Sequence, residues 1–191
     1  MSTKRILSTR KLVLAAMFIA LGLILPFLTQ IPSLGNRFLP MHLPILVAGF
    51  VCGWPLGLLI GFITPLFRSL LFGMPPMFPT AVAMSFELAA FGLLTGLFYR
   101  LLPKKIPFIY VTLILAMVLG RVVWGMVSLV LYGIAGNPFT WQIFMTSAFV
   151  NAIPGIILQL ILVPLLVKAF EKARLIETKS NLKYSTRPKE L

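Results

Sequence analysis

The chain has 191 residues, of which 59% are hydrophobic and 11% are charged, with 17 Lys and Arg against four Asp and Glu. So few charged residues exclude an ordinary soluble domain and indicate a membrane protein. The length suits one compact domain without a separate soluble enzyme module, and the single Cys52 excludes an intrachain disulfide.

The basic residues are clustered along the chain. The three clusters are Lys4–Lys11, Arg100–Lys105 and Lys168–Lys189, and long apolar stretches separate them. Loops rich in Lys and Arg stay on the cytoplasmic side of a membrane. Both termini and the loop at residues 100–105 are therefore predicted to be cytoplasmic. The net charge of +13 is interpreted as contact with anionic lipid headgroups and not with nucleic acid.

Six membrane-spanning helices are predicted, because about 20 helical residues cross the roughly 30 Å core of a bilayer. Residues 12–99 suit four crossings and residues 106–167 suit two longer ones, with breakers rich in Gly and Pro between them. The expected helices cover about residues 10–28, 40–53, 56–72, 80–102, 107–132 and 141–173. The predicted fold is an all-α integral membrane protein, a six-helix bundle. Residues 1–173 would form its one transmembrane domain, and residues 174–191 a basic cytoplasmic tail.

Small residues recur at a spacing of four in several predicted helices. They are Ala16 and Ala20; Gly49, Gly53, Gly57 and Gly61; and Gly92 and Gly96. Residues at this spacing stack on one helix face and let backbones approach closely in lipid. The glycines are interpreted as internal helix packing. The alanine pair could instead face a separate membrane protein.

The motifs of several enzyme classes are missing from the sequence. There is no GxxxxGK[ST] phosphate loop and no HExxH motif, and the chain has one His and one Cys. ATP binding through a phosphate loop and a metal site are therefore not expected. We expect no cofactor and no enzymatic activity.

Three charged residues fall inside the predicted helices: Arg68, Glu87 and Arg121. A charge in a membrane is costly, so each is expected to face the interior and to pair or to bind something. An Arg–Glu pair that holds the bundle together is one interpretation. Two arginines against one carboxylate leave a surplus positive charge, which favours an anionic ligand because Arg binds carboxylates through a two-pronged fork.

Other polar side chains could line the same binding site, which is predicted to open to the outside of the membrane. Trp124 and Ser128 share a helix face with Arg121, and Ser147 and Asn151 share a face on the last helix. The complete set of candidate substrate-binding residues is Arg68, Arg121, Glu87, Asn151, His42, Trp124, Ser147, Asn36 and Arg37. Helix capping or packing is the alternative for His42, and a solvated loop is the alternative for Asn36 and Arg37.

Several sequence segments between residues 39 and 92 carry a resemblance to a known family. They are LPMHLPIL at residues 39–46, GFVCG at residues 49–53, GLLIG at residues 57–61, TPL at residues 64–66, GMPPMFP at residues 73–79 and MSFELAAFG at residues 84–92. Together they resemble the substrate-binding S component of energy-coupling factor (ECF) transporters, the vitamin-uptake systems of prokaryotes. Within that family the chain is most similar to the pantothenate-specific branch.

The resemblance implies a multi-pass protein of the prokaryotic plasma membrane that captures a vitamin from outside. Such a component works with a transmembrane T component and two ATPase subunits, which supply the ATP site that this chain lacks. It is thought to topple in the membrane to release its substrate inside. An AxxxA-type motif on the first helix contacts the T component in that family, and Ala16 and Ala20 match it.

The sequence therefore predicts a high-affinity vitamin-binding subunit of an ATP-driven importer for pantothenate. Arg68 or Arg121 would hold the substrate carboxylate, Glu87 would orient an arginine or accept a hydroxyl, and Asn151 would bond the polar middle of the substrate. One alternative is an S component for a vitamin B6 form, folate or a modified-base precursor. Others are a stand-alone proton-coupled transporter with Glu87 as proton carrier, and a non-transporting scaffold of the cell envelope.

Overall fold

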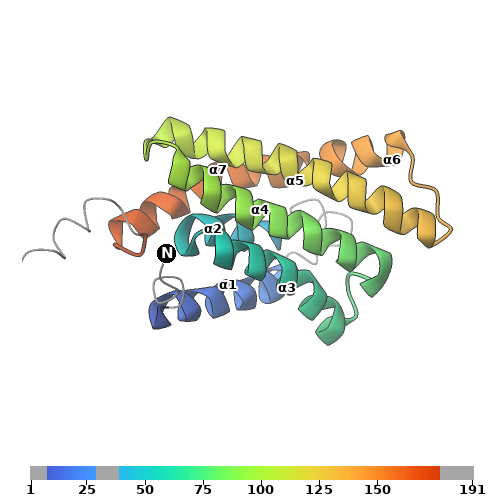
Figure 1. Ribbon diagram of the computed structural model, residues 1–191, viewed down its shortest axis with the longest axis horizontal. Helices are drawn as coiled ribbons and strands as arrows, with labels where there is room; N and C mark the ends of the chain where they lie inside the picture. Colours follow the sequence, from blue (N-terminus) through green and yellow to red (C-terminus); the bar gives the residue numbers. More distant parts are fainter. Residues whose placement is uncertain (1–7, 29–38, 177–191) are drawn as a thin grey trace, which may run out of the picture.

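The computed structural model describes residues 8–28 and 39–176, and every regular element within these residues is a helix. Figure 1 shows the long helices lying lengthwise beside one another. The elements are α1 (Thr9–Leu28), α2 (His42–Cys52), α3 (Trp54–Phe72), the π-helical turn η3 (Met77–Ala81), α4 (Val82–Leu101), α5 (Ile106–Ile134), α6 (Trp141–Met145), the π-helical turn η4 (Thr146–Val150) and α7 (Ile153–Lys172). The all-α prediction is confirmed for these residues. The first five predicted helices agree with α1 to α5 within two residues at each end.

Five segments of the described chain are long and apolar enough to cross a membrane. They are Thr9–Phe27, Trp54–Phe72, Met77–Leu101, Ile106–Ile134 and Trp141–Lys172. The remaining helix, α2, has 11 residues, which at about 1.5 Å per residue is roughly half the thickness of the bilayer core. The protein is therefore a multi-helix membrane protein, while six complete crossings and cytoplasmic termini stay predictions.

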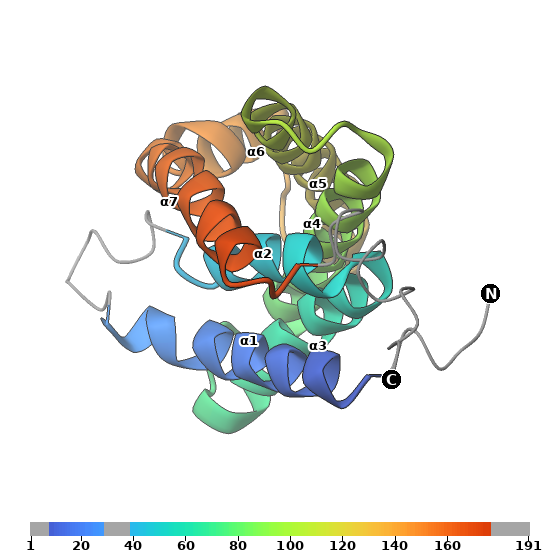
Figure 2. The same ribbon diagram turned by 90° about the vertical axis from the view of Figure 1, so that its left-hand side faces the viewer.

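The short helix α2 is the centre of the bundle. All of its 11 residues except Leu43 are buried. It contacts α1, α3, α4 and α7. Figure 2 shows α2 between α1 on one side and α5 and α7 on the other. A helix that is apolar on all sides is stable only when it is surrounded. The first residue of α2 is therefore held inside the protein, where a polar side chain meets other helices instead of water.

Glycines bring α2, α3 and α4 into backbone contact. A Cβ atom placed on Gly57 would lie 2.5 Å from the carbonyl oxygen of Gly92, and one on Gly92 would meet the carbonyl of Gly57 in return. Gly49 and Gly61 face α4 just as closely. The prediction that these glycines serve internal packing is confirmed, since small residues permit such close approach in membrane helices.

The last predicted helix, expected to run unbroken over residues 141–173, is divided in the structure. It consists of α6, the π-helical turn η4 and α7, with Asn151 and Ala152 in a turn between the last two. The physical reason is Pro154, which has no N–H to donate to the carbonyl of Val150. At the end of η4, the backbone N–H of Asn151 donates to the carbonyl of Thr146, five residues back, at 2.8 Å.

Candidate functional site

His42, Glu87 and Arg121 lie together inside the bundle. The distance from Arg121 Nη1 to Glu87 Oε1 is 2.8 Å, and that from His42 Nε2 to Glu87 Oε2 is 3.6 Å. The three side chains are between 2% and 8% exposed. Each comes from a different helix: α2, α4 and α5 respectively. The predicted Arg–Glu pair is therefore confirmed for Arg121, and His42 joins it.

Phe91 positions this cluster from one turn further along α4 than Glu87. Its ring lies 5.5 Å from the ring of His42, centre to centre. The same ring occupies the space that a side chain at position 120 would need, so Gly120 lets α5 approach α4 closely. Because Gly120 immediately precedes Arg121, this contact also brings the backbone of Arg121 close to α4, which carries Glu87. The contact of Phe91 with Gly120 thus permits the close approach of the two helices that carry the ion pair.

Several buried polar atoms have no hydrogen-bond partner among the described residues. They are Nδ1 and Nε2 of His42, Oε1 of Glu87, the hydroxyls of Thr112 and Ser128, and Nε2 of Gln159; Oε1 of Glu87 lies in the ion pair with Arg121. A polar group buried without a hydrogen bond costs free energy, and lipid offers none in exchange. These atoms therefore have hydrogen-bonding capacity available for a polar ligand or for water.

Arg68 lies apart from the cluster and faces α1. Its guanidinium donates a hydrogen bond to the carbonyl of Leu23 at 2.5 Å. The same group lies 4.7 Å from the ring centre of Phe27 and 5.7 Å from that of Phe72. The two arginines that the sequence analysis considered together are thus separated. The surplus positive charge lies between α1 and α3, while Arg121 and Glu87 balance each other.

The other candidate residues have different surroundings. Trp124 belongs to an aromatic group with Phe139 and Phe144, at centre-to-centre distances of 5.6 and 6.1 Å. Ser147 in η4 is half-buried, whereas Asn151 is exposed in the turn before α7. Asn36 and Arg37 lie outside the described residues, as does most of the predicted tail at residues 174–191. Of the candidate set, the structure brings together His42, Glu87 and Arg121.

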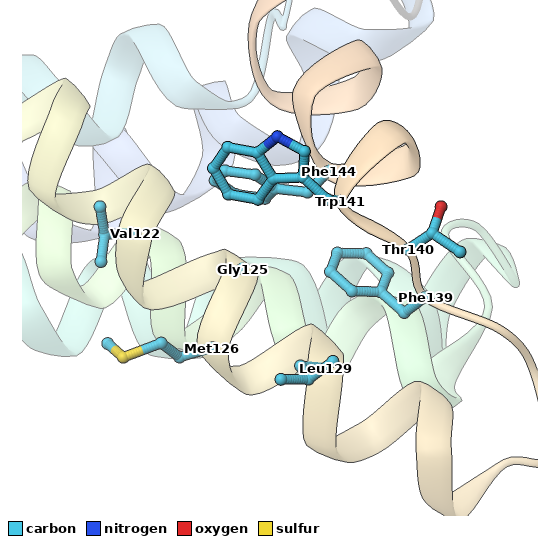
Figure 3. A pocket seen from close by; sticks show the side chains of 8 residues that line it. All are labelled: Val122, Gly125, Met126, Leu129, Phe139, Thr140, Trp141 and Phe144. Atoms are coloured by element: carbon cyan, nitrogen blue, oxygen red, sulfur yellow. The ribbon is translucent and has the colours of Figure 1, made fainter.

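An apolar hollow of about 450 Å³ lies between α5 and α6. Figure 3 shows aromatic rings of the α6 side facing Val122, Met126 and Leu129 of α5. The full lining is Val122, Gly125, Met126, Leu129, Phe139, Thr140, Trp141 and Phe144. The hydroxyl of Thr140 caps α6 by accepting the N–H of Ile143 at 3.3 Å. This hollow opens on the apolar outside of the bundle and does not suit a charged vitamin.

Ala16 and Ala20 both lie on the exposed side of α1. The buried residues of that helix are Leu14, Ala15, Phe18 and Gly22. Within residues 8–28 and 39–176, the alanine pair is therefore not packed inside the bundle. The pair is available to another membrane protein.

Gln159 is one of several buried polar residues that were not among the predicted site residues; the others are Thr64, Ser69, Ser85, Thr95 and Thr112. Gln159 of α7 is 1% exposed, and His42, for which helix capping or packing was the alternative to a binding role, is 2% exposed. The signal for Gln159 was an amide inside a long apolar run, which membrane helices rarely carry without a purpose. Within the described residues, no three His, Cys, Asp or Glu side chains are grouped so that they could hold a metal ion.

A comparison with protein families gives one match. The family described as "ECF transporter, substrate-specific component" matches residues 10–167 of the chain. No curated protein and no solved structure matches. The matched region contains α1 to α6 and most of α7, including the whole cluster of His42, Glu87 and Arg121.

Proposed function

This chain belongs to the substrate-specific components of ECF transporters, and we propose that it binds pantothenate for an ATP-driven importer. As a member of that family it is a membrane-embedded subunit of a transporter and not an enzyme. The observation that carries the proposed site is the buried cluster of His42, Glu87 and Arg121. Three ionisable side chains at the centre of an apolar bundle are costly without a functional partner.

The chemistry of the cluster suits a small carboxylate with hydroxyl and amide groups. The contact with Glu87 uses one nitrogen of Arg121, and a guanidinium has five N–H donors, so the same arginine can also bind a substrate carboxylate. Both ring nitrogens of His42 lack a hydrogen-bond partner among the described residues. The oxygens of Glu87 can accept hydroxyl groups. Pantothenate carries a carboxylate, hydroxyl groups and an amide, which these side chains could bind.

The proposal assigns the carboxylate to Arg121 in preference to Arg68. Arg68 already donates to a backbone carbonyl and lies against two aromatic rings between α1 and α3. Ser147, Asn151 and Trp124 would contact the substrate on its way in, from the outer side of the membrane. In this proposal Asn36 and Arg37, which precede α2 in the sequence, also contact the substrate.

The proposed partners are a transmembrane T component and two ATPase subunits in the prokaryotic plasma membrane. The exposed Ala16 and Ala20 of α1 supply a flat stripe on which a partner helix can pack. Ala16→Trp should weaken association with the T component and leave vitamin binding by the isolated chain unchanged. Val118→Trp, at an exposed position on α5, is the matched control and should leave association intact.

Isothermal titration of the detergent-purified chain against a vitamin panel tests the substrate. The panel contains pantothenate, pyridoxine, folate and a modified-base precursor, together with pantothenol, which replaces the carboxylate of pantothenate by an alcohol. We expect pantothenate to bind, and to bind at least about tenfold more tightly than pantothenol, because a hydrogen bond to a charged group contributes about 1.5–3 kcal/mol. Tight binding of another vitamin would correct the substrate, and no binding by folded protein would refute the proposed function.

Two arginine variants test the assignment of the carboxylate. Arg121→Ala should lose the preference for pantothenate over pantothenol, and Arg68→Ala should keep it. If both variants bind pantothenate with unchanged affinity, neither arginine holds the carboxylate.

An uptake assay separates the S component from a stand-alone proton-coupled carrier. Cells that express the chain with its partners should accumulate pantothenate as long as ATP is available. A protonophore that stops uptake while ATP stays high would instead favour Glu87 as a proton carrier.

A further inference from the structure

Four helices form a closed ring around the buried cluster. In order around the ring, α2 contacts α4, α4 contacts α5, α5 contacts α7, and α7 contacts α2 again. Figure 2 looks along this ring and shows α7 opposite α4. Three of the four helices contribute His42, Glu87 and Arg121. The fourth, α7, has one buried polar side chain, Gln159.

Gln159 lies 13 residues from the end of α7, Glu87 lies 14 residues from the end of α4, and Arg121 lies 15 residues from the start of α5. Heights can be counted from the end of the bundle where α4 ends, α5 begins and α7 ends, at about 1.5 Å per residue. On that scale Glu87 is about 21 Å, Arg121 about 22 Å and Gln159 about 20 Å from this end. Counted along the helices, the buried polar side chain of α7 is therefore about as far from this end as Glu87 and Arg121 are.

The amide of Gln159 has unused hydrogen-bonding capacity. Its side chain is 1% exposed, and its Nε2 has no hydrogen-bond partner among the described residues. A glutamine that served only to hold helices together would bond a neighbouring helix. An unpaired amide donor instead makes the empty protein less stable than an apolar side chain of the same size would.

We propose that Gln159 is a specificity residue whose Nε2 donates a hydrogen bond to an acceptor oxygen of the substrate. The acceptor is an amide carbonyl or a carboxylate oxygen on a molecule held by His42, Glu87 and Arg121. This inference rests on the proposed function. It extends the site to α7, so that the substrate bridges all four helices of the ring.

Two variants of the full-length chain, Gln159→Met and Gln159→Leu, test the inference. Both remove the donor and keep an apolar side chain of similar size. The matched control is Thr112→Val, because Thr112 is also completely buried with an unpartnered hydroxyl. It lies on α5 about 13 Å from the level of Arg121, counted along the helix.

The measurements are titration with pantothenate and thermal unfolding with and without pantothenate. The Gln159 variants should bind pantothenate about tenfold more weakly, as expected for one lost hydrogen bond to a buried acceptor. Without ligand they should unfold at or above the temperature of the wild type. Thr112→Val should bind within twofold of the wild type.

Each possible result either supports the inference or overturns it. If the Gln159 variants bind as the wild type does, or if they unfold earlier without ligand or do not fold, Gln159 is a structural residue and the inference is wrong. An equal loss of affinity in Thr112→Val would also overturn it, because the effect would then follow from burial and not from position. If the wild type binds no vitamin of the panel, the proposed function fails and this inference fails with it.

Discussion

The ion pair between Glu87 and Arg121 should be the most strongly coupled pair of charges in the described part of the protein. Its atoms are 2.8 Å apart and its side chains are 2% and 8% exposed. At that distance the attraction is about 6 kcal/mol with an effective dielectric constant of about 20. Glu87→Gln alone leaves a buried arginine without its counter-charge. Removal of one partner from a buried pair costs about 3–5 kcal/mol.

A double-mutant cycle measures this coupling directly. Glu87→Gln and Arg121→Met should each lower the unfolding temperature of the ligand-free chain in detergent, by roughly 6–20 °C. The double variant should be more stable than the sum of the single effects predicts, because neither charge is then left alone. We expect a coupling free energy of about 2–3 kcal/mol.

The matched control is the pair Glu171–Lys168 on α7. Its atoms are closer, at 2.6 Å, but the Lys168 side chain is 38% exposed. Water screens such a pair, so its coupling should stay below about 1 kcal/mol. If the Glu87–Arg121 cycle gives no more coupling than this control, burial does not strengthen the pair and the argument for a costly, functional cluster is refuted.

Two further predictions concern packing and the second arginine. Gly92→Ala should destabilise the chain by about 1–3 kcal/mol, because its methyl group would meet the carbonyl of Gly57. Thermal unfolding measures the effect, and the control is Gly133→Ala, whose added methyl group would have no neighbouring atom within 4 Å. Equal destabilisation by the two substitutions would contradict the close packing at Gly92. Arg68→Met should lower the unfolding temperature, through loss of the bond to Leu23, and leave pantothenate affinity unchanged in titration. A selective loss of affinity would instead place Arg68 in the site.

Composition and breakers predicted the helices well, because lipid leaves few alternatives. A span must be helical and apolar for about 20 residues, so Gly and Pro clusters mark its ends. The break in the last helix could have been predicted from Pro154, whose missing N–H leaves the carbonyl of Val150 without its usual donor. Because the residues around Pro154 are mostly apolar, one unbroken helix was predicted over residues 141–173.

The partners of the buried charges could not be predicted from the sequence. Arg68 and Arg121 have similar apolar neighbours in sequence, and both were candidates for Glu87. The choice depends on how α3 and α5 are rotated about their axes, and close contacts such as that of Gly120 with Phe91 determine this rotation. These contacts join residues that are far apart in the chain, so no local pattern reveals them.

The shortness of α2 links the fold to the proposed site. A full-length helix would have placed its first residue near the membrane surface, where a histidine meets water. With 11 residues, α2 spans about 16 Å, and its first residue, His42, lies beside Glu87 inside the bundle. The N-terminal end of a helix carries a partial positive charge. An anionic substrate at the proposed site would therefore gain from the start of α2 as well as from Arg121.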